Sequence, residues 1–170
     1  MKHLVIKLTL YLFATASIIS SCKKESTSDN TPTGTGSFSV NGKSYNTPYG
    51  FIDKSNGFFD LQFTDVANIS PNYKSLAGFQ ILSSDESLVS KTYPFVFYPN
   101  TGLVEGYFDI NGIGGIRFGN PNSGSMTISK DGNTYNITYT ITVRDSSETT
   151  IADKVITGSY KGSLTTLIRE

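Results

Sequence analysis

Hydrophobic and polar residues alternate most clearly along residues 134–144. Tyrosine, isoleucine and valine occupy the odd positions, and threonine, asparagine and arginine occupy the even ones. A period of two over such a length predicts a long antiparallel strand with one buried face. Residues 125–130 alternate in the same way, and Asp131-Gly132 between the runs supplies the glycine that a tight turn needs. The pattern therefore predicts a β-hairpin made of these two strands.

Shorter alternating runs continue through the rest of the chain from residue 37. Asn41-Gly42 predicts a second tight hairpin. Apolar side chains fall at every second position in four further segments, 58–63, 77–81, 93–97 and 104–110. A last strand is expected over 155–168, where Gly158 and Gly162 share the inward parity and indicate close packing. We therefore predict an all-β fold, a single antiparallel β-sandwich or flattened β-barrel of about 8–10 strands.

Proline and glycine mark the expected interruptions of these strands. Pro94 predicts that its strand lies at a sheet edge, because proline cannot donate a hydrogen bond to a neighbouring strand. Residues 120–124 (Asn-Pro-Asn-Ser-Gly) predict a turn, which would separate a short strand near Ile116 from the strand at 125–130.

The first 22 residues follow a different pattern. Lys2, His3 and Lys7 make the beginning positive, and residues 8–19 form an uninterrupted apolar or small-residue run. Such a run fits the core of an export signal and is too short to span a bilayer, which takes about twenty residues. This segment therefore predicts export from the cytoplasm.

Ile19-Ser20-Ser21-Cys22 resembles the bacterial lipobox, which is an aliphatic residue, two small residues and a cysteine. The resemblance implies that a signal peptide, residues 1–21, is removed and that Cys22 carries diacylglycerol and further acyl chains of the palmitate type. Cys22 is also the only cysteine of the chain, and an unpaired thiol is otherwise unusual in an exported protein.

The chain resembles small outer-membrane lipoproteins of Gram-negative bacteria in three features: the lipobox, the opening hairpin of the domain at 38–43, and the tail of the domain, residues 126–162. These families are all-β, and many have no assigned activity. Lys23 stands where many inner-membrane lipoproteins carry aspartate. The resemblance thus implies a lipid anchor in the outer membrane of the cell envelope, on its periplasmic or its cell-surface face.

The exported chain divides into a tether and one domain. Residues 22–36 are expected to form the lipidated cysteine and a flexible tether, because 23–36 contain no large apolar side chain. Residues 37–170 are enough for a single antiparallel β domain. Without Lys2 and Lys7, twelve basic residues stand against fourteen acidic ones, and no basic cluster remains. Nucleic acid is therefore excluded as a partner, and membrane contact is expected through the lipid anchor.

The exported chain offers little to catalysis. The single histidine, His3, leaves with the signal peptide, and the single thiol is Cys22. Ser-His-Asp and Cys-His catalysis and zinc or copper sites built on His or Cys are therefore excluded. Four carboxylates remain as candidates for a hydrolase: Asp60, Asp65, Glu105 and Asp109. They fall on separate segments, so solvated strand faces are the preferred interpretation, and we predict no enzyme, no cofactor and no metal site.

Tyrosine side chains are the remaining candidates for a binding site. Five of them fall in turns or at outward positions: Tyr45, Tyr49, Tyr73, Tyr98 and Tyr107. An exposed tyrosine can stack on a sugar ring or fill a pocket of a partner, and we single out Tyr98 and Tyr107 as speculative ligand-binding residues. Two functions stay open: a non-catalytic binding module for a glycan, a lipid or a small ligand, and a structural or accessory subunit of an envelope protein assembly.

Overall fold

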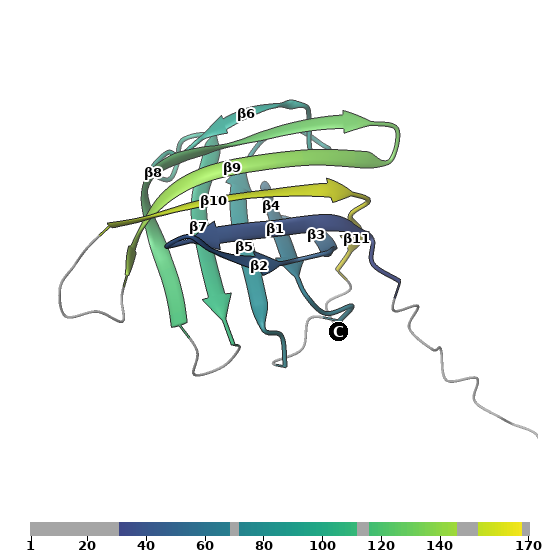
Figure 1. Cartoon of the computed structure of the whole chain (residues 1–170). Helices are drawn as coiled ribbons and strands as arrows, with labels where there is room; N and C mark the ends of the chain where they lie inside the picture. Colours follow the sequence, from purple (N-terminus) through teal and green to yellow (C-terminus); the bar gives the residue numbers. More distant parts are fainter. Residues whose placement is uncertain (1–30, 69–71, 112–115, 146–152, 168–170) are drawn as a thin grey trace, which may run out of the picture.

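A computed structural model of the protein describes residues 31–68, 72–111, 116–145 and 153–167, and every regular element within these ranges is a β-strand (Figure 1). The strands are β1 (Gly34–Val40), β2 (Lys43–Asn46), β3 (Tyr49–Ser55), β4 (Phe58–Thr64), β5 (Ser75–Leu82), β6 (Lys91–Pro94), β7 (Gly102–Ile110), β8 (Ile116–Asp131), β9 (Thr134–Asp145), β10 (Asp153–Gly162) and β11 (Thr165–Thr166). The predicted all-β fold is confirmed. No helix of the described ranges is long and apolar enough to cross a membrane.

The strands form one hydrogen-bonded path in the order β11-β3-β4-β5-β7-β8-β9-β10-β1-β2, while β6 pairs with β8 beside it. Every named pairing is antiparallel except that of β11 with β3. The path bends over so that two layers pack face to face, as in a sandwich. Figure 1 shows the strands β8, β9, β10 and β1 of the first layer crossing those of the second, β7, β5, β4 and β3.

Strand β8 connects the two layers. Its first residues pair with β7, Ile116 opposite Ile110, and its later residues pair with β6, Met126 opposite Tyr93. Between them the register with β9 shifts at Gly119 and again at Pro121. Such irregularities bend a strand and let it pass from one sheet to another. The turn predicted at 120–124 is therefore wrong, because the strand bends there without reversing.

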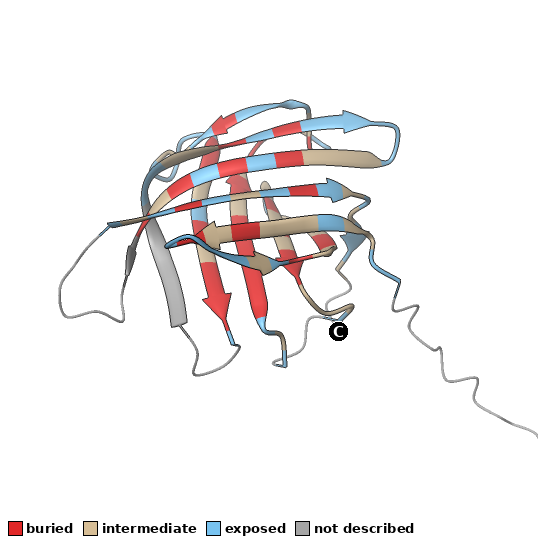
Figure 2. Ribbon diagram, in the orientation of Figure 1, coloured by how far each residue is buried: buried red, intermediate tan, exposed pale blue. Residues whose placement is uncertain are grey.

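The core lies between the layers, and both contribute alternate side chains to it (Figure 2). Phe79 of β5 is its centre: its ring lies 5.5 Å from that of Phe108 and 4.6 Å from that of Tyr139. Burying a large apolar side chain stabilises a fold by about 1.5–3 kcal/mol. The outer face of the first layer is polar, with the exposed side chains Thr127, Thr138 and Ser159 in register on neighbouring strands.

Two tyrosine rings inside the core lie across glycines of the neighbouring strand. Tyr139 faces Gly158, where an added Cβ would lie 2.3 Å from the Tyr139 ring, and Tyr160 faces Gly36, where it would lie 2.9 Å away. Burial raises the pKa of both phenols. Gly158 is a close-packing position, but the group that approaches it is the Tyr139 ring and not another backbone.

Several strand boundaries differ from those the alternation predicts. β3 was not predicted, and β1 begins at Gly34, three residues before the expected start of the domain. The single strand expected at 155–168 is divided. β10 ends at Gly162, where the Tyr160 hydroxyl donates to the Ser163 carbonyl, and β11 follows and pairs with β3. Phe97 was expected to face inward with its strand, but β6 ends at Pro94 and Phe97 is exposed.

The expected edge position of the strand with Pro94 is confirmed, since β6 lies beside the main path and pairs with β8. The signal peptide 1–21, Cys22 and most of the tether lie outside the described residues.

The glycine beneath Tyr139 gives a direct test of this packing. Gly158→Ala adds a methyl group that overlaps the Tyr139 ring, and we expect the substitution to lower the free energy of unfolding by about 1–3 kcal/mol. Gly106→Ala is the matched control, because its added Cβ would meet the nearest atoms at 3.4 Å, an ordinary contact. Urea denaturation measures both, and equal losses would contradict the packing described.

Candidate functional site

Three neighbouring strands of the second layer, β4, β5 and β7, carry their outward residues in register. Three rows result: Phe58, Leu82 and Gly102, then Asp60, Gln80 and Glu105, then Gln62, Gly78 and Tyr107. Strand geometry places neighbouring rows about 6.7 Å apart and neighbouring strands about 4.8 Å apart. This side of the layer is opposite the core, so the rows form an outer surface.

A pocket of about 430 Å³ opens on this surface. Its lining comes from the end of β3, the turn after it and the strands β4, β5 and β7: Ser55, Asn56, Phe58, Asp60, Leu61, Gln62, Phe79, Gln80, Glu105 and Tyr107. Leu61 and Phe79 belong to the core, and the other lining residues are partly or fully exposed. The volume falls within the range of small-molecule sites, roughly 300–1,000 Å³.

Tyr107 forms one wall of the pocket because its strand neighbour is a glycine. A Cβ added at Gly78 would lie 2.1 Å from the Tyr107 ring, so the ring covers the backbone at that point. Burial raises the pKa of Tyr107, and the carboxylates of Asp60 and Glu105 raise it further. The phenol therefore stays protonated and can donate as well as accept a hydrogen bond.

The middle row is a strip of hydrogen-bonding groups. Gln80 Nε2 donates to Asp60 Oδ1 at 3.0 Å, and Glu105 lies exposed on the other side of Gln80. Two strand spacings put the Cα atoms of the two carboxylates about 10 Å apart. Acceptors thus stand at both ends of the strip, with an amide between them.

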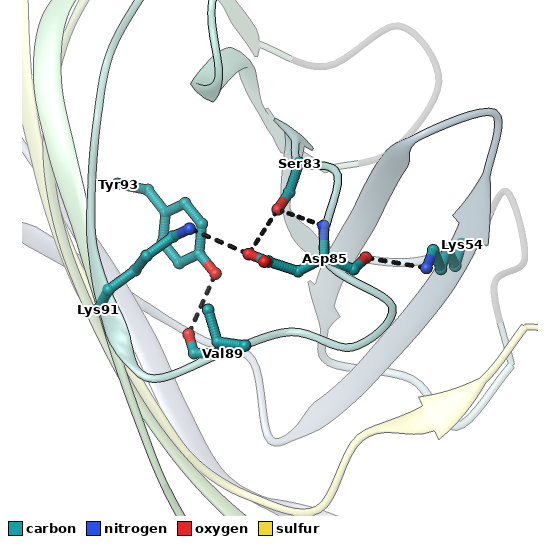
Figure 3. A network of polar contacts seen from close by, with 6 residues as sticks. All are labelled: Lys54, Ser83, Asp85, Val89, Lys91 and Tyr93. Carbon is teal, nitrogen blue, oxygen red and sulfur yellow. Dashed lines mark hydrogen bonds and ion pairs between the residues drawn. The ribbon is translucent and has the colours of Figure 1, made fainter.

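The turn that forms the rim of the pocket is held in place by its neighbours. Asn56 and Gly57 both have positive φ, 51° and 83°, as a two-residue hairpin turn requires. Ser83 N donates to the Gly57 carbonyl at 2.9 Å. Lys54 Nζ, at the end of β3, donates to the Asp85 carbonyl at 2.9 Å (Figure 3). The segment after β5 therefore fixes the turn.

That segment is itself cross-linked around one carboxylate (Figure 3). Asp85 Oδ2 accepts from Ser83 Oγ at 2.8 Å and pairs with Lys91 Nζ at 3.0 Å, and the Tyr93 hydroxyl donates to the Val89 carbonyl at 3.0 Å. The Ser83 hydroxyl and the Lys91 ammonium lower the pKa of the Asp85 carboxyl. The network ties the chain between β5 and β6 into a fixed support for the rim.

The structure brings the two singled-out tyrosines to the same region. Tyr107 lines the pocket, and Tyr98 is 70% exposed and stacks on Phe58, which also lines it, with ring centroids 6.3 Å apart. Other tyrosines engage elsewhere: Tyr45 stacks on the core residue Phe38 at 5.2 Å.

The four candidate carboxylates are not gathered together. Asp60 and Glu105 share the pocket, while Asp65 Oδ1 accepts from the backbone N–H groups of Lys74 and Ser75. Asp109 was expected on a solvated face, but it is 3% exposed and accepts a hydrogen bond from Tyr73 at 2.8 Å. That expectation is wrong because the chain between β4 and β5 covers this end of the surface.

Side chains of the types that bind metal ions are also dispersed in the described part of the chain. Among the described residues, no three His, Cys, Asp or Glu side chains lie close enough to hold a metal ion.

Sequence reasoning missed Asn56, Phe58 and Gln80 as site residues. Asn56-Gly57 between two apolar runs is a strong hairpin signal, and it would have revealed β3 and the rim. Gln80 and Phe58 carry no local signal, since their role depends on the register of three strands. Comparison with protein-family models, with curated proteins and with solved structures finds no match to this chain, so the pocket itself is the basis for inferring function.

Proposed function

We propose that the protein is a lipid-anchored envelope module that binds carbohydrate in the pocket on β4, β5 and β7 without transforming it. The observation that carries the proposal is the combination of aromatic walls with a strip of carboxylate and amide groups in one open pocket. Phe58 and Tyr107 supply the walls, and Asp60, Gln80 and Glu105 supply the strip.

The groups of the pocket match the two surfaces of a sugar. A pyranose presents an apolar face of C–H groups, which packs on an aromatic ring, and a rim of hydroxyls that donate and accept. Carboxylates accept from hydroxyls in short, charge-assisted bonds, whereas the Gln80 amide can donate as well as accept. Asp60, Gln80 and Glu105 therefore address several hydroxyls of one unit.

The same groups disfavour a lipid or another apolar ligand. An apolar molecule filling the pocket would displace the water around Asp60, Gln62 and Gln80. It would offer these side chains no hydrogen bonds in return. Each polar group left unsatisfied in this way costs about 1–3 kcal/mol. Of the two ligand classes, lipid and glycan, the glycan is the one whose hydroxyls match the polar lining.

The second candidate function, a subunit of an envelope assembly, has less support. Strand addition needs an accessible sheet edge. β2 and β6 have four residues each, and β11 pairs with Phe51 and Ile52 on the outer side of β3. Lys43 on β2 and Pro94 on β6 are the residue types that natural proteins place on edges to prevent such pairing. These features favour a domain that acts as a single copy.

The entry of the tether supports an accessible pocket. Thr33 precedes β1, and its Oγ1 accepts from Gly50 N at 2.9 Å, at the beginning of β3. The pocket's Ser55 lies at the other end of β3, five residues and about 17 Å away. A chain anchored at Cys22 would therefore reach the domain at a distance from the pocket rim.

Carbohydrate binding is tested by affinity gel electrophoresis of the full chain in gels containing starch, mannan, xylan or a soluble cellulose derivative. We expect at least one polysaccharide to retard the protein and Tyr107→Ala to reduce the apparent affinity about tenfold or more, the loss of one well-placed ring and its hydroxyl. Tyr135→Ala is the control, because this half-buried tyrosine belongs to the other layer. Retardation by none of the four, or equal loss in both variants, contradicts the proposal.

The anchor is tested by metabolic labelling with radioactive palmitate in a Gram-negative host. We expect the parent chain to be labelled and Cys22→Ser to be unlabelled and released from the membrane fraction, because the thiol is the attachment point. Ser20→Ala keeps a small residue before the cysteine and should be labelled like the parent. A Cys22→Ser protein that sediments with membranes as the parent does would refute the anchor.

A further inference from the structure

Large hydrophobic side chains that are exposed within the described ranges are few, and two of the three are consecutive. Phe97 is 76% exposed and Tyr98 is 70% exposed, and both lie between β6 and β7; the third is Val155 of β10, at 57%. Exposed aromatic rings that adjoin one another commonly mark a binding surface. We call Phe97 and Tyr98 the aromatic shelf.

The backbone around the aromatic shelf is well fixed. Val96 N donates to the Leu103 carbonyl at 2.8 Å, and the Asn100 side chain and backbone N–H both donate to the Phe97 carbonyl, at 2.9 and 3.1 Å. The Phe97 ring also meets that of Phe95 edge-on at 5.5 Å. Rings held in this way lose little conformational entropy when a ligand packs on them.

The shelf continues the surface of the pocket. Tyr98 stacks on Phe58 with an angle of 20° between the ring planes, and Phe58 is in register with Leu82 and, through it, with Gly102 at the beginning of β7. From the row of Tyr107 to the row of Phe58 the distance is about 13 Å along the strands. A further 6.3 Å separates the rings of Phe58 and Tyr98. This span is much longer than one pyranose ring.

We propose that the pocket and the aromatic shelf form one extended cleft for a linear oligosaccharide, with separate sugar units at Tyr107, at Phe58 and on the shelf. The inference rests on the carbohydrate-binding function proposed above and adds that the ligand is a chain rather than a single sugar. Polar groups at the Tyr107 end set the orientation of the first units, and Tyr98 and Phe97 hold later units by stacking.

A protein partner or a lipid surface fits the shelf less well. A stable protein interface buries about 800 Å² on each side, far more than two neighbouring side chains provide. The shelf contacts Phe58, and the pocket that Phe58 lines also contains Asp60 and Glu105. These carboxylates would repel an anionic membrane surface that lay over the pocket and the shelf together.

The experiment measures affinity against chain length by calorimetry, with cello-, malto- and manno-oligosaccharides of one to six units and the full chain in detergent. We expect the affinity of at least one series to rise about two- to tenfold for each added stacked unit and then to level off. The variant with Phe97→Ala and Tyr98→Ala should lose the rise, so that the longer oligosaccharides bind to it no more tightly than the disaccharide does. Val155→Ala removes an exposed apolar side chain from the other layer and should behave as the parent.

The possible failures are distinguishable. Affinity that does not rise beyond the disaccharide, or a rise that survives in the double variant, overturns the extended cleft and leaves carbohydrate binding standing. Absence of binding by all three series overturns both the cleft and carbohydrate binding by these glycans. Binding of a Cys22→Ser chain to phosphatidylcholine vesicles that is lost in the double variant would assign the shelf to lipid and also overturn the cleft.

Discussion

Tyrosine rings that lie across glycines of the neighbouring strand are the packing device on which this structure depends. A glycine removes the Cβ that would hold the ring away from the backbone, so the ring covers the strand. Tyr139 over Gly158 uses the device inside the core, where it joins β9 to β10 and brings the ring against Phe79. The same device on the outside of the sandwich, at Tyr107, produces a pocket wall instead of a core contact.

The candidate site follows from the register that this packing helps to fix. Because β4, β5 and β7 are paired, with one register shift after Gln80, aromatic, carboxylate and amide groups that are far apart in the sequence meet on one surface. The turn at Asn56 and the network around Asp85 support its rim from the side of β3. A rim fixed in advance lowers the entropy that binding would otherwise cost. The fold therefore presents a prepared surface, and the exposed ring of Tyr98 extends it beyond the pocket.

The sequence patterns predicted those features of the fold that depend on residues close together in the chain. The hairpin of β8 and β9 was foreseen because alternation and the Gly132 turn lie side by side in the chain. Residues 120–124 were misinterpreted, because their proline and glycine are equally compatible with a bent strand that stays paired with β9. Asp109 has the outward parity expected, yet the chain before β5 covers it, which parity does not reveal. Tyr98 and Tyr107 were singled out individually. Tyr107 lines the same pocket as Phe58, on which Tyr98 stacks, and this placement depends on long-range register that no local pattern encodes.

The central proposal is that carbohydrate binds to the outer surface of β4, β5 and β7. The most direct measurement is the change in amide chemical shifts of the isotope-labelled chain during titration with a mixture of cello-, malto- and manno-oligosaccharides. The account predicts that the largest changes cluster at Asn56, Gln80 and Tyr107, while Thr138 and Ser159 on the other layer stay unmoved. Changes centred on Thr138 and Ser159, on the outer face of the other layer, or no changes at all, would contradict carbohydrate binding at the pocket.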